Sequence, residues 1–210
     1  VGKGGICHAL FPEKGLIRPG MLVVGSDSHT CTYGALGAFS SGMGATDTAA
    51  AMALGETWLK VPETIRMNYQ GKLSSRVRGK DIILHALSIL GVEGALYRAI
   101  EFDGSAVHAL DMDGRFTICN MAIEAGAKNG IIAPDEITER YVRERTQEPF
   151  TCYTSDEDAQ YFKEYTFDAS SLPPLVAKPF SPGNVSPVED VHGVKVDQVV
   201  IGSCTNGRIQ

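Results

Sequence analysis

The sequence lacks a long apolar run and an excess of positive charge, and each absence excludes a class of partner. Its apolar segments, such as residues 21–24 and 199–201, are far shorter than the roughly 20 residues that span a bilayer. Lys and Arg number 19 against 25 Asp and Glu, which gives a net charge of −6. No basic stripe is present to neutralise phosphates, so we expect neither a nucleic acid nor a membrane as a partner.

The cysteines lack the spacing of two common cysteine-based structures. They are Cys7, Cys31, Cys119, Cys152 and Cys204, an odd number with no CxxC pair, so neither a disulfide framework nor a four-cysteine zinc module is indicated. The default expectation is therefore a reducing, cytoplasmic setting. In such a setting most cysteines are small buried apolar residues.

Glycine, by contrast, is abundant, with 23 of 210 residues, and 10 prolines accompany it. That mixture favours many loops of defined backbone over a helical bundle, within an ordinary globular composition of 43% hydrophobic and 21% charged residues. The chain starts without an initiator methionine and stops a few residues after an expected strand, so we expect it to be a fragment.

Apolar runs and periodicity predict strands that alternate with helices, which indicates an α/β fold. The expected strands cover residues 20–24, 65–69, 95–102 and 194–201. The expected helices cover residues 46–59, 81–90, 116–125 and 135–145, with a further one starting at a capping box at 155–158. Residues 173–187 contain five prolines without periodicity, which is typical of a linker or an extended crossing segment.

Two loops share one layout, in which an apolar strand is followed by Gly-Ser and then by a polar cluster. The two clusters are Asp27-Ser28-His29 and Cys204-Thr205-Asn206. Ligands of open α/β sheets bind at the carboxyl ends of strands, so both clusters lie where chemistry is expected. The glycine ahead of each cluster permits a sharp turn and a close approach of the backbone to a ligand.

Two enzymatic interpretations of the first loop remain as alternatives. Adjacent Asp, Ser and His cannot form a triad by themselves, and no Gly-x-Ser-x-Gly elbow occurs, which disfavours a serine hydrolase. A mononuclear metal site of mixed ligands is a second possibility. Its ligands would come from Cys7, His8, Asp27, His29 and Cys31. The simpler interpretation of the two cysteines is that they are core thiols.

Asn120 and Glu124 are four residues apart, which places them on one face of the expected helix. Their neighbours are apolar or small, so a carboxylate is unusual there. If that face is buried, Glu124 needs partners or a raised pKa, and either would suit it to proton transfer. The alternative is a hydrogen-bonded pair with a purely structural role.

Three motifs together resemble the aconitase superfamily, and within it the branch of large subunits that act on isopropylmalate. They are VGSDSHT at 24–30, NMAIEAGA at 120–127 and IGSCTN at 201–206, in the family's order over nearly the whole chain. The resemblance implies α/β/α layered domains. It implies the end of a first domain at 1–62, a second domain at 63–172, a proline-rich linker at 173–193, and the first strand and cluster loop of a third domain at 194–210.

The resemblance also implies a [4Fe–4S] hydro-lyase that interconverts 2-isopropylmalate and 3-isopropylmalate by dehydration and rehydration in leucine biosynthesis. Three cysteine thiolates would hold the cluster, and its open iron would act as a Lewis acid on the leaving hydroxide. Cys204 matches the first cluster ligand. The residues that match catalytic positions are His8, Asp27, His29 and Glu124, and those that match substrate-binding positions are Ser28 and Asn120.

The chain also departs from the family pattern. The CxxC that supplies the other two cluster ligands is expected downstream, and an Asp-His pair and the substrate-clamping arginines are missing. A separate small subunit would carry the swivelling domain with the serine base. We therefore expect the chain alone to be inactive and to hold no intact cluster. The alternatives are a homoaconitate or dimethylmalate hydro-lyase, a non-catalytic scaffold or proteolytic fragment, and, less favoured, a zinc enzyme.

Overall fold

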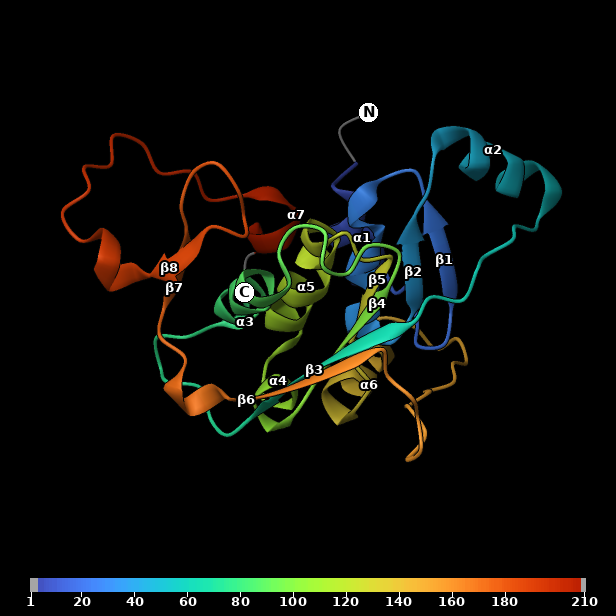
Figure 1. The fold of residues 1–210 in the computed structure, drawn as a ribbon. Helices are drawn as coiled ribbons and strands as arrows, with labels where there is room; N and C mark the ends of the chain where they lie inside the picture. Colours follow the sequence, from blue (N-terminus) through green and yellow to red (C-terminus); the bar gives the residue numbers. More distant parts are fainter. Residues whose placement is uncertain (1–3, 209–210) are drawn as a thin grey trace.

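Within residues 4–208, which the computed structural model describes, the strands form three separate sheets (Figure 1). Strands β1 (Leu22–Gly25) and β2 (Phe39–Gly42) pair in parallel. A second sheet is parallel throughout and has the order β5-β4-β3-β6, with the bounds Asn129–Ile131, Ala99–Asp103, Thr64–Gln70 and Lys163–Asp168. The third is an antiparallel pair of β7 (Leu175–Ala177) and β8 (Val185–Pro187).

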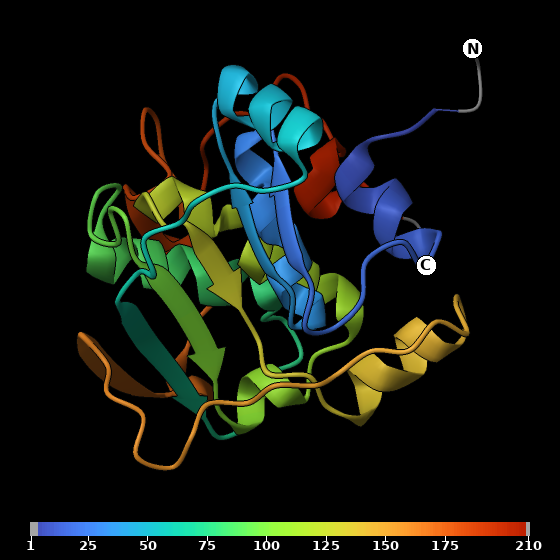
Figure 2. The ribbon, with the colours of Figure 1, turned by 90° about the vertical axis from the view of Figure 1, so that its right-hand side faces the viewer.

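Helices connect and cover these strands, which confirms the predicted α/β fold (Figure 2). The α-helices are α1 (Cys7–Glu13), α2 (Ala45–Leu54), α3 (Gly79–Leu90), α4 (Ser105–His108), α5 (Met112–Asn120), α6 (Glu136–Arg143) and α7 (Ser203–Asn206). The 3-10 helices are η1 (Ser28–Leu36), η2 (Met121–Ala125), η3 (Ala169–Ser171) and η4 (Val188–Val191). No helix formed by residues 4–208 has the length and apolar character needed to cross a bilayer.

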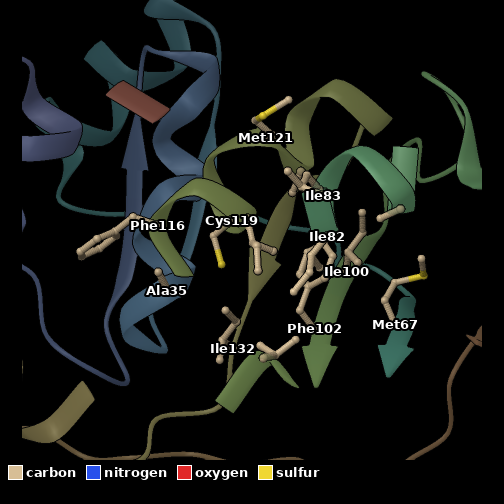
Figure 3. Close-up of a cluster of buried hydrophobic side chains, with 14 of the residues drawn as sticks. Ala35, Met67, Ile82, Ile83, Ile100, Phe102, Phe116, Cys119, Met121 and Ile132 are labelled. Carbon is tan, nitrogen blue, oxygen red and sulfur yellow. The ribbon is translucent and has the colours of Figure 1, made fainter. Parts of the chain in front are cut away.

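The core lies between the four-stranded sheet and helices α3 and α5 (Figure 3). Along β3 the predicted alternation is confirmed, because Ile65, Met67 and Tyr69 are at most 1% exposed while the residues between them are half-buried. Ile83 of α3 and Phe102 of β4 belong to the same buried cluster. Burial of each such side chain contributes about 1.5–3 kcal/mol, so this cluster fixes α3 and α5 on the sheet.

Helix η1 joins the N-terminal segment to the rest of the fold. Seven of its nine residues are buried, and it packs against α5 and β5. The approach is close enough to require glycine, since a Cβ on Gly34 would lie 1.7 Å from the carbonyl oxygen of Gly130. Residues 4–62 and 63–172 therefore share one core, and the division of the chain into two domains at residue 62 stays a prediction.

Helix ends follow local signals at several predicted positions. Gly126 has φ 80° and ends the helical stretch 112–125, as predicted. Asp135 caps α6 by accepting hydrogen bonds from the backbone N–H groups of Ile137 and Thr138. The helix predicted over 46–59 begins slightly earlier, with Gly44 rather than Thr46 as its N-cap. It is shorter overall because it ends at Leu54, where Gly55 with φ 73° forms the C-cap.

Three C-terminal predictions differ from the structure. The capping box at 155–158 starts no helix, because the Ser155 hydroxyl bonds to the Glu101 carboxylate instead of capping a turn. The apolar stretch 194–201 forms no strand, since no strand of the described chain pairs with it, and Val200 and Ile201 are more than 80% exposed. The proline-rich segment is not a simple linker, because it contains the β7–β8 hairpin, which packs against α3.

Candidate active site

The two polar loops singled out in the sequence meet at Asn120, the last residue of α5. The Asn120 side-chain amide donates to the Thr32 hydroxyl over 2.7 Å and to the Cys204 sulfur over 3.2 Å. Asn120 is only 1% exposed, so its amide is buried, whereas the Cys204 thiol that it contacts is partly exposed. The structure thus brings together the segment after β1 and the loop around α7.

His8 and Asp27 form the second feature of this site. The His8 Nε2 atom lies 2.7 Å from Asp27 Oδ1, which also accepts the backbone N–H of His29 over 2.7 Å. The hydrogen bond from His8 lowers the pKa of Asp27 most, and that from the His29 backbone adds to it against the opposing effect of burial. Asp27 is therefore a carboxylate at neutral pH, and its side chain remains 56% exposed.

The His8 ring, in contrast, is enclosed. Its exposure is 3%, and its Nδ1 atom lies 3.2 Å from the Tyr33 hydroxyl. Both ring nitrogens therefore have protein partners, and neither faces open solvent. His8 is placed to act through Asp27 rather than to touch a bound molecule.

Two further titratable side chains, those of His29 and Glu124, are partly accessible beside Asp27. The His29 Nε2 atom lies 3.6 Å from Glu124 Oε1, and the Ser28 hydroxyl lies 3.3 Å from its Nδ1 atom. The side chains of His29 and Glu124 are 31% and 36% exposed. Burial lowers the pKa of Lys80 of α3, and the negative charge of Glu124 partly opposes that effect. Glu124 thus has the partners that its apolar surroundings demanded.

The loop that carries Cys204 is held by contacts the sequence did not indicate. Thr117 donates to the carbonyl oxygen of Thr205 over 2.7 Å, and Ser203 has a φ of 69°, in the left-handed region. The Arg208 guanidinium donates to the His8 carbonyl oxygen over 3.3 Å and lies 4.5 Å from the Phe116 ring centroid. Figures 1 and 2 both place α7 beside α1. Arg208 therefore links the Cys204 loop to the helix that carries His8.

The electrostatics around Arg208 agree with this buried position. Its side chain is 10% exposed, and its Nε atom lies 3.7 Å from Asp113 Oδ1. Burial lowers the pKa of Arg208, and the negative charge of Asp113 opposes that effect. No motif or spacing in the sequence marks this arginine, because its partners on α1 and α5 are distant in the chain.

Cys31 is a core thiol, as the simpler interpretation of Cys7 and Cys31 predicted, whereas Cys7 is only partly buried; Cys119 is a second core thiol. Both core thiols have 0% exposure, burial raises the pKa of Cys31 to about 12, and burial raises that of Cys119 as well. The Cys31 thiol points at the backbone oxygen of Asn120, 3.4 Å away. Among residues 4–208 no three His, Cys, Asp or Glu side chains are grouped so as to hold a metal ion.

Cys204 and Asn120 fit one ligand position of an iron–sulfur cluster. Cys204 is a partly exposed thiol, and the amide of Asn120 at 3.2 Å is a donor suited to a thiolate sulfur. The resemblance implies a four-iron cluster held by three cysteines, of which Cys204 is the one expected among residues 4–208. The residues present therefore match a cluster ligand and its hydrogen-bond partner but not a complete binding site.

Comparison with known proteins agrees with these features. The model of the aconitase family (aconitate hydratase) matches residues 1–210. The 3-isopropylmalate dehydratase large subunit of Heliobacterium modesticaldum is 60% identical over 210 residues, which are 100% of this chain and 50% of that protein. The protein of the same name from Thermodesulfovibrio yellowstonii is 57% identical over 210 residues, again 100% of this chain and 50% of that protein. The protein of this name from Aquifex aeolicus is 58% identical over 206 residues, which are 98% of this chain and 48% of that protein. The chain spans about half the length of these curated relatives.

Proposed function

Because the chain belongs to the aconitase family, we propose that it is part of the large subunit of a 3-isopropylmalate dehydratase. Such an enzyme interconverts 2-isopropylmalate and 3-isopropylmalate by removing and re-adding water, a step of leucine biosynthesis. The observation that carries the proposal is the contact of Asn120 with Cys204, next to the His8–Asp27 pair. The relatives that bear this name share 56–60% identity with the chain.

In this proposal Cys204 is one of three thiolate ligands of a [4Fe–4S] cluster. The other two cysteines come from the part of the relatives that the chain does not span. The bound cluster supplies Lewis acidity to the departing hydroxyl group. Asn120 donates an N–H to the Cys204 sulfur and so fixes its orientation.

His29 and Glu124 are the proposed proton carriers. Their 3.6 Å separation and partial exposure allow a proton on His29 to be held by the Glu124 carboxylate and passed to the departing hydroxyl oxygen. The C–O bond then breaks with release of water, and a base removes the proton from the neighbouring carbon. The resemblance implies that this base is a serine on the small subunit. In rehydration the same groups act in reverse.

Asp27 and Ser28 orient the reactants. The Asp27 carboxylate is fixed by His8 and by the His29 backbone, and the Ser28 hydroxyl is available to a substrate carboxylate. His8 supports the charge of Asp27, so its catalytic effect is indirect. A positioned acid–base pair such as His29 and Glu124 typically contributes a factor of 10²–10⁴ in rate.

We further propose the partner subunit, the substrate class, the cellular setting and the domain division of this enzyme. A small subunit with a swivelling domain completes the site, and the name "large subunit" of the relatives supports this. The substrate is a small hydroxy-acid with two or three carboxylates. The setting is cytoplasmic, since thiolate ligation requires Cys204 to stay reduced. Residues 1–62 and 63–172 are the end of a first and the whole of a second domain.

The test is turnover by a complete large subunit that contains this sequence, assembled with its small subunit and an anaerobically reconstituted cluster. We expect His29→Asn to lower kcat by about 10²–10⁴. The control is His192→Asn, a change outside the site, which should leave kcat unaltered. Equal activity of His29→Asn and the unaltered enzyme would contradict the proposed role.

The same assembly separates the alternative functions. Assays with isopropylmalate, homoaconitate and dimethylmalate identify the substrate, and we expect isopropylmalate to give the highest kcat/KM. The absence of turnover of all three acids with a stoichiometric cluster in place would favour a non-catalytic scaffold.

A further inference from the structure

Tyr33 carries a buried phenol for which the proposed reaction gives no role. It lies in η1 with 2% exposure, and its ring stacks on that of Phe11 with centroids 6.4 Å apart. Its hydroxyl lies 3.2 Å from His8 Nδ1, on the side of the imidazole opposite Asp27. Hydrogen bonds thus connect buried Tyr33 through His8 to Asp27, whose side chain is partly exposed at the candidate site.

We propose that Tyr33 is a positioning residue, whose hydroxyl holds His8 in the Nε2–H tautomer and so keeps Asp27 oriented toward the reactants. The structural part of this inference concerns the imidazole alone. Its consequence for catalysis rests on the proposed function.

The direction of each hydrogen bond follows from the protons available. A carboxylate only accepts, so the 2.7 Å contact with Asp27 requires a proton on His8 Nε2. The Nδ1 atom of a neutral imidazole is then an acceptor and needs a donor. The Tyr33 hydroxyl can be that donor, because burial raises the pKa of Tyr33 and keeps the phenol protonated. The Cys7 thiol, 3.6 Å from the same nitrogen, is a weaker donor.

A second tyrosine–histidine pair in the molecule shows the opposite arrangement and supplies a control. The Tyr69 hydroxyl lies 3.0 Å from His85 Nδ1, and Tyr69 is also fully buried. Its hydroxyl donates to the carbonyl oxygen of Ile82 over 3.3 Å, so it accepts the proton of His85 Nδ1. No carboxylate of the described residues forms an ion pair with His85. Tyr69 therefore also contacts a histidine Nδ1 atom, but that histidine holds no carboxylate on the other side of its ring.

Removal of the Tyr33 hydroxyl has a defined local effect. In Tyr33→Phe the buried Nδ1 atom loses its strong donor, and an unpaired buried acceptor is unfavourable. The imidazole then populates the Nδ1–H tautomer as well, or it rotates about its Cβ–Cγ bond. Either change interrupts the N–H contact that fixes Asp27.

The first test measures the tautomer directly on the 210-residue chain. Long-range ¹H–¹⁵N correlation spectra of ¹⁵N-histidine-labelled protein distinguish protonated from unprotonated ring nitrogens. We expect a single Nε2–H tautomer for His8 in the unaltered chain and in Tyr69→Phe, and a mixed or exchange-broadened signal in Tyr33→Phe. An Nδ1–H tautomer in the unaltered chain would overturn the proposal without any variant. An unchanged His8 signal in a folded Tyr33→Phe would do so as well.

The second test measures catalysis in the assembled enzyme. Loss of the group that orients a metal-binding histidine typically lowers activity 10–100-fold, and we use the same range for the orientation of His8. We expect a decrease of this order in kcat for Tyr33→Phe, with KM and iron content unchanged, and no decrease for Tyr69→Phe. Equal kcat values would overturn the catalytic part. If no variant turns over isopropylmalate, the proposed function fails, whereas the NMR result still decides the tautomer.

Discussion

Replacement of Arg115 by methionine perturbs the support beneath the candidate site. Arg115 lies in α5, the helix that ends at Asn120, and its side chain has 0% exposure. The guanidinium forms a two-pronged ion pair with Asp135, with both N–O distances at 2.7 Å. It also donates to the carbonyl oxygens of His108 and Leu110. All of these contacts depend on one fully buried cation.

The loss in the free energy of unfolding depends on which of the two charges remains after the substitution. Removal of one partner from a buried ion pair costs about 3–5 kcal/mol. In Arg115→Met the remaining Asp135 side chain is 28% exposed and keeps the backbone N–H groups of Ile137 and Thr138. We therefore expect a loss of about 3 kcal/mol in the free energy of unfolding. Asp135→Asn leaves the cation itself buried, so its cost lies nearer 5 kcal/mol.

Urea unfolding followed by circular dichroism measures both values. The matched control is Arg143→Met on α6, whose side chain is 67% exposed and pairs with Glu139 at 3.5 Å. This exposed pair and the contact of the Arg143 guanidinium with the Phe150 ring, 4.8 Å from its centroid, together contribute about 1 kcal/mol, well below the loss expected for Arg115→Met. The double variant Arg115→Met/Asp135→Asn should lose less than the sum of the single losses. If Arg115→Met cost no more than the control, or if the two single losses simply added, the reasoning would be refuted.

Three further predictions concern pH, thiol reactivity and the cluster. Burial opposes ionisation of Asp135, but the hydrogen bonds and charge of its arginine partner outweigh this and lower its pKa below 3.8. The stability gap between the unaltered chain and Asp135→Asn should therefore be full above pH 3.8 and shrink as pH falls through the depressed value; a gap independent of pH would contradict this. Iodoacetamide should label the exposed Cys152 in the native chain and spare the buried Cys31 and Cys119, as mass spectrometry of the peptides would show; equal labelling would count against their burial. Anaerobic reconstitution of the 210-residue chain alone should give no stoichiometric four-iron cluster, and iron and sulfide analysis showing one would disprove the single-ligand account.

The local parts of the fold were readable from the sequence. Asp135 follows a proline and precedes a helical pattern, and its carboxylate caps the next turn over 3.0–3.1 Å. Gly126 could be assigned as a helix end because few other residues adopt its φ of 80°. These signals act between residues adjacent in the chain, so one sequence suffices to detect them.

Predictions that required a distant partner were less successful. Residues 194–201 are apolar enough for a strand, but a strand forms only where another strand accepts its hydrogen bonds. Ser155 resembles a helix cap, yet its hydroxyl bonds to Glu101 of β4, more than fifty positions earlier. A local pattern cannot reveal that competition.

The candidate site shows the same division. The positions of Asp27 and Cys204 follow from loops after apolar segments, whereas the contribution of Tyr33 and Arg208 depends on contacts with His8 that span 25 and 200 positions. Asn120 and Glu124 have different partners, although their spacing predicted that they lie on one face of a helix. The backbone changes from α to 3-10 geometry at residue 121, and Asn120 faces Cys204 while Glu124 lies beside His29.

The central claim is that Cys204 and the residues around it belong to the active site of a cluster-dependent hydro-lyase. The most direct measurement compares a complete large subunit with its Cys204→Ala variant, each reconstituted with iron and sulfide and assembled with the small subunit. Dehydration of isopropylmalate is followed by the absorbance of the unsaturated acid, with iron content measured in parallel. The account predicts turnover by the unaltered enzyme and loss of both cluster and turnover in Cys204→Ala. A variant that keeps its cluster and its turnover would contradict it.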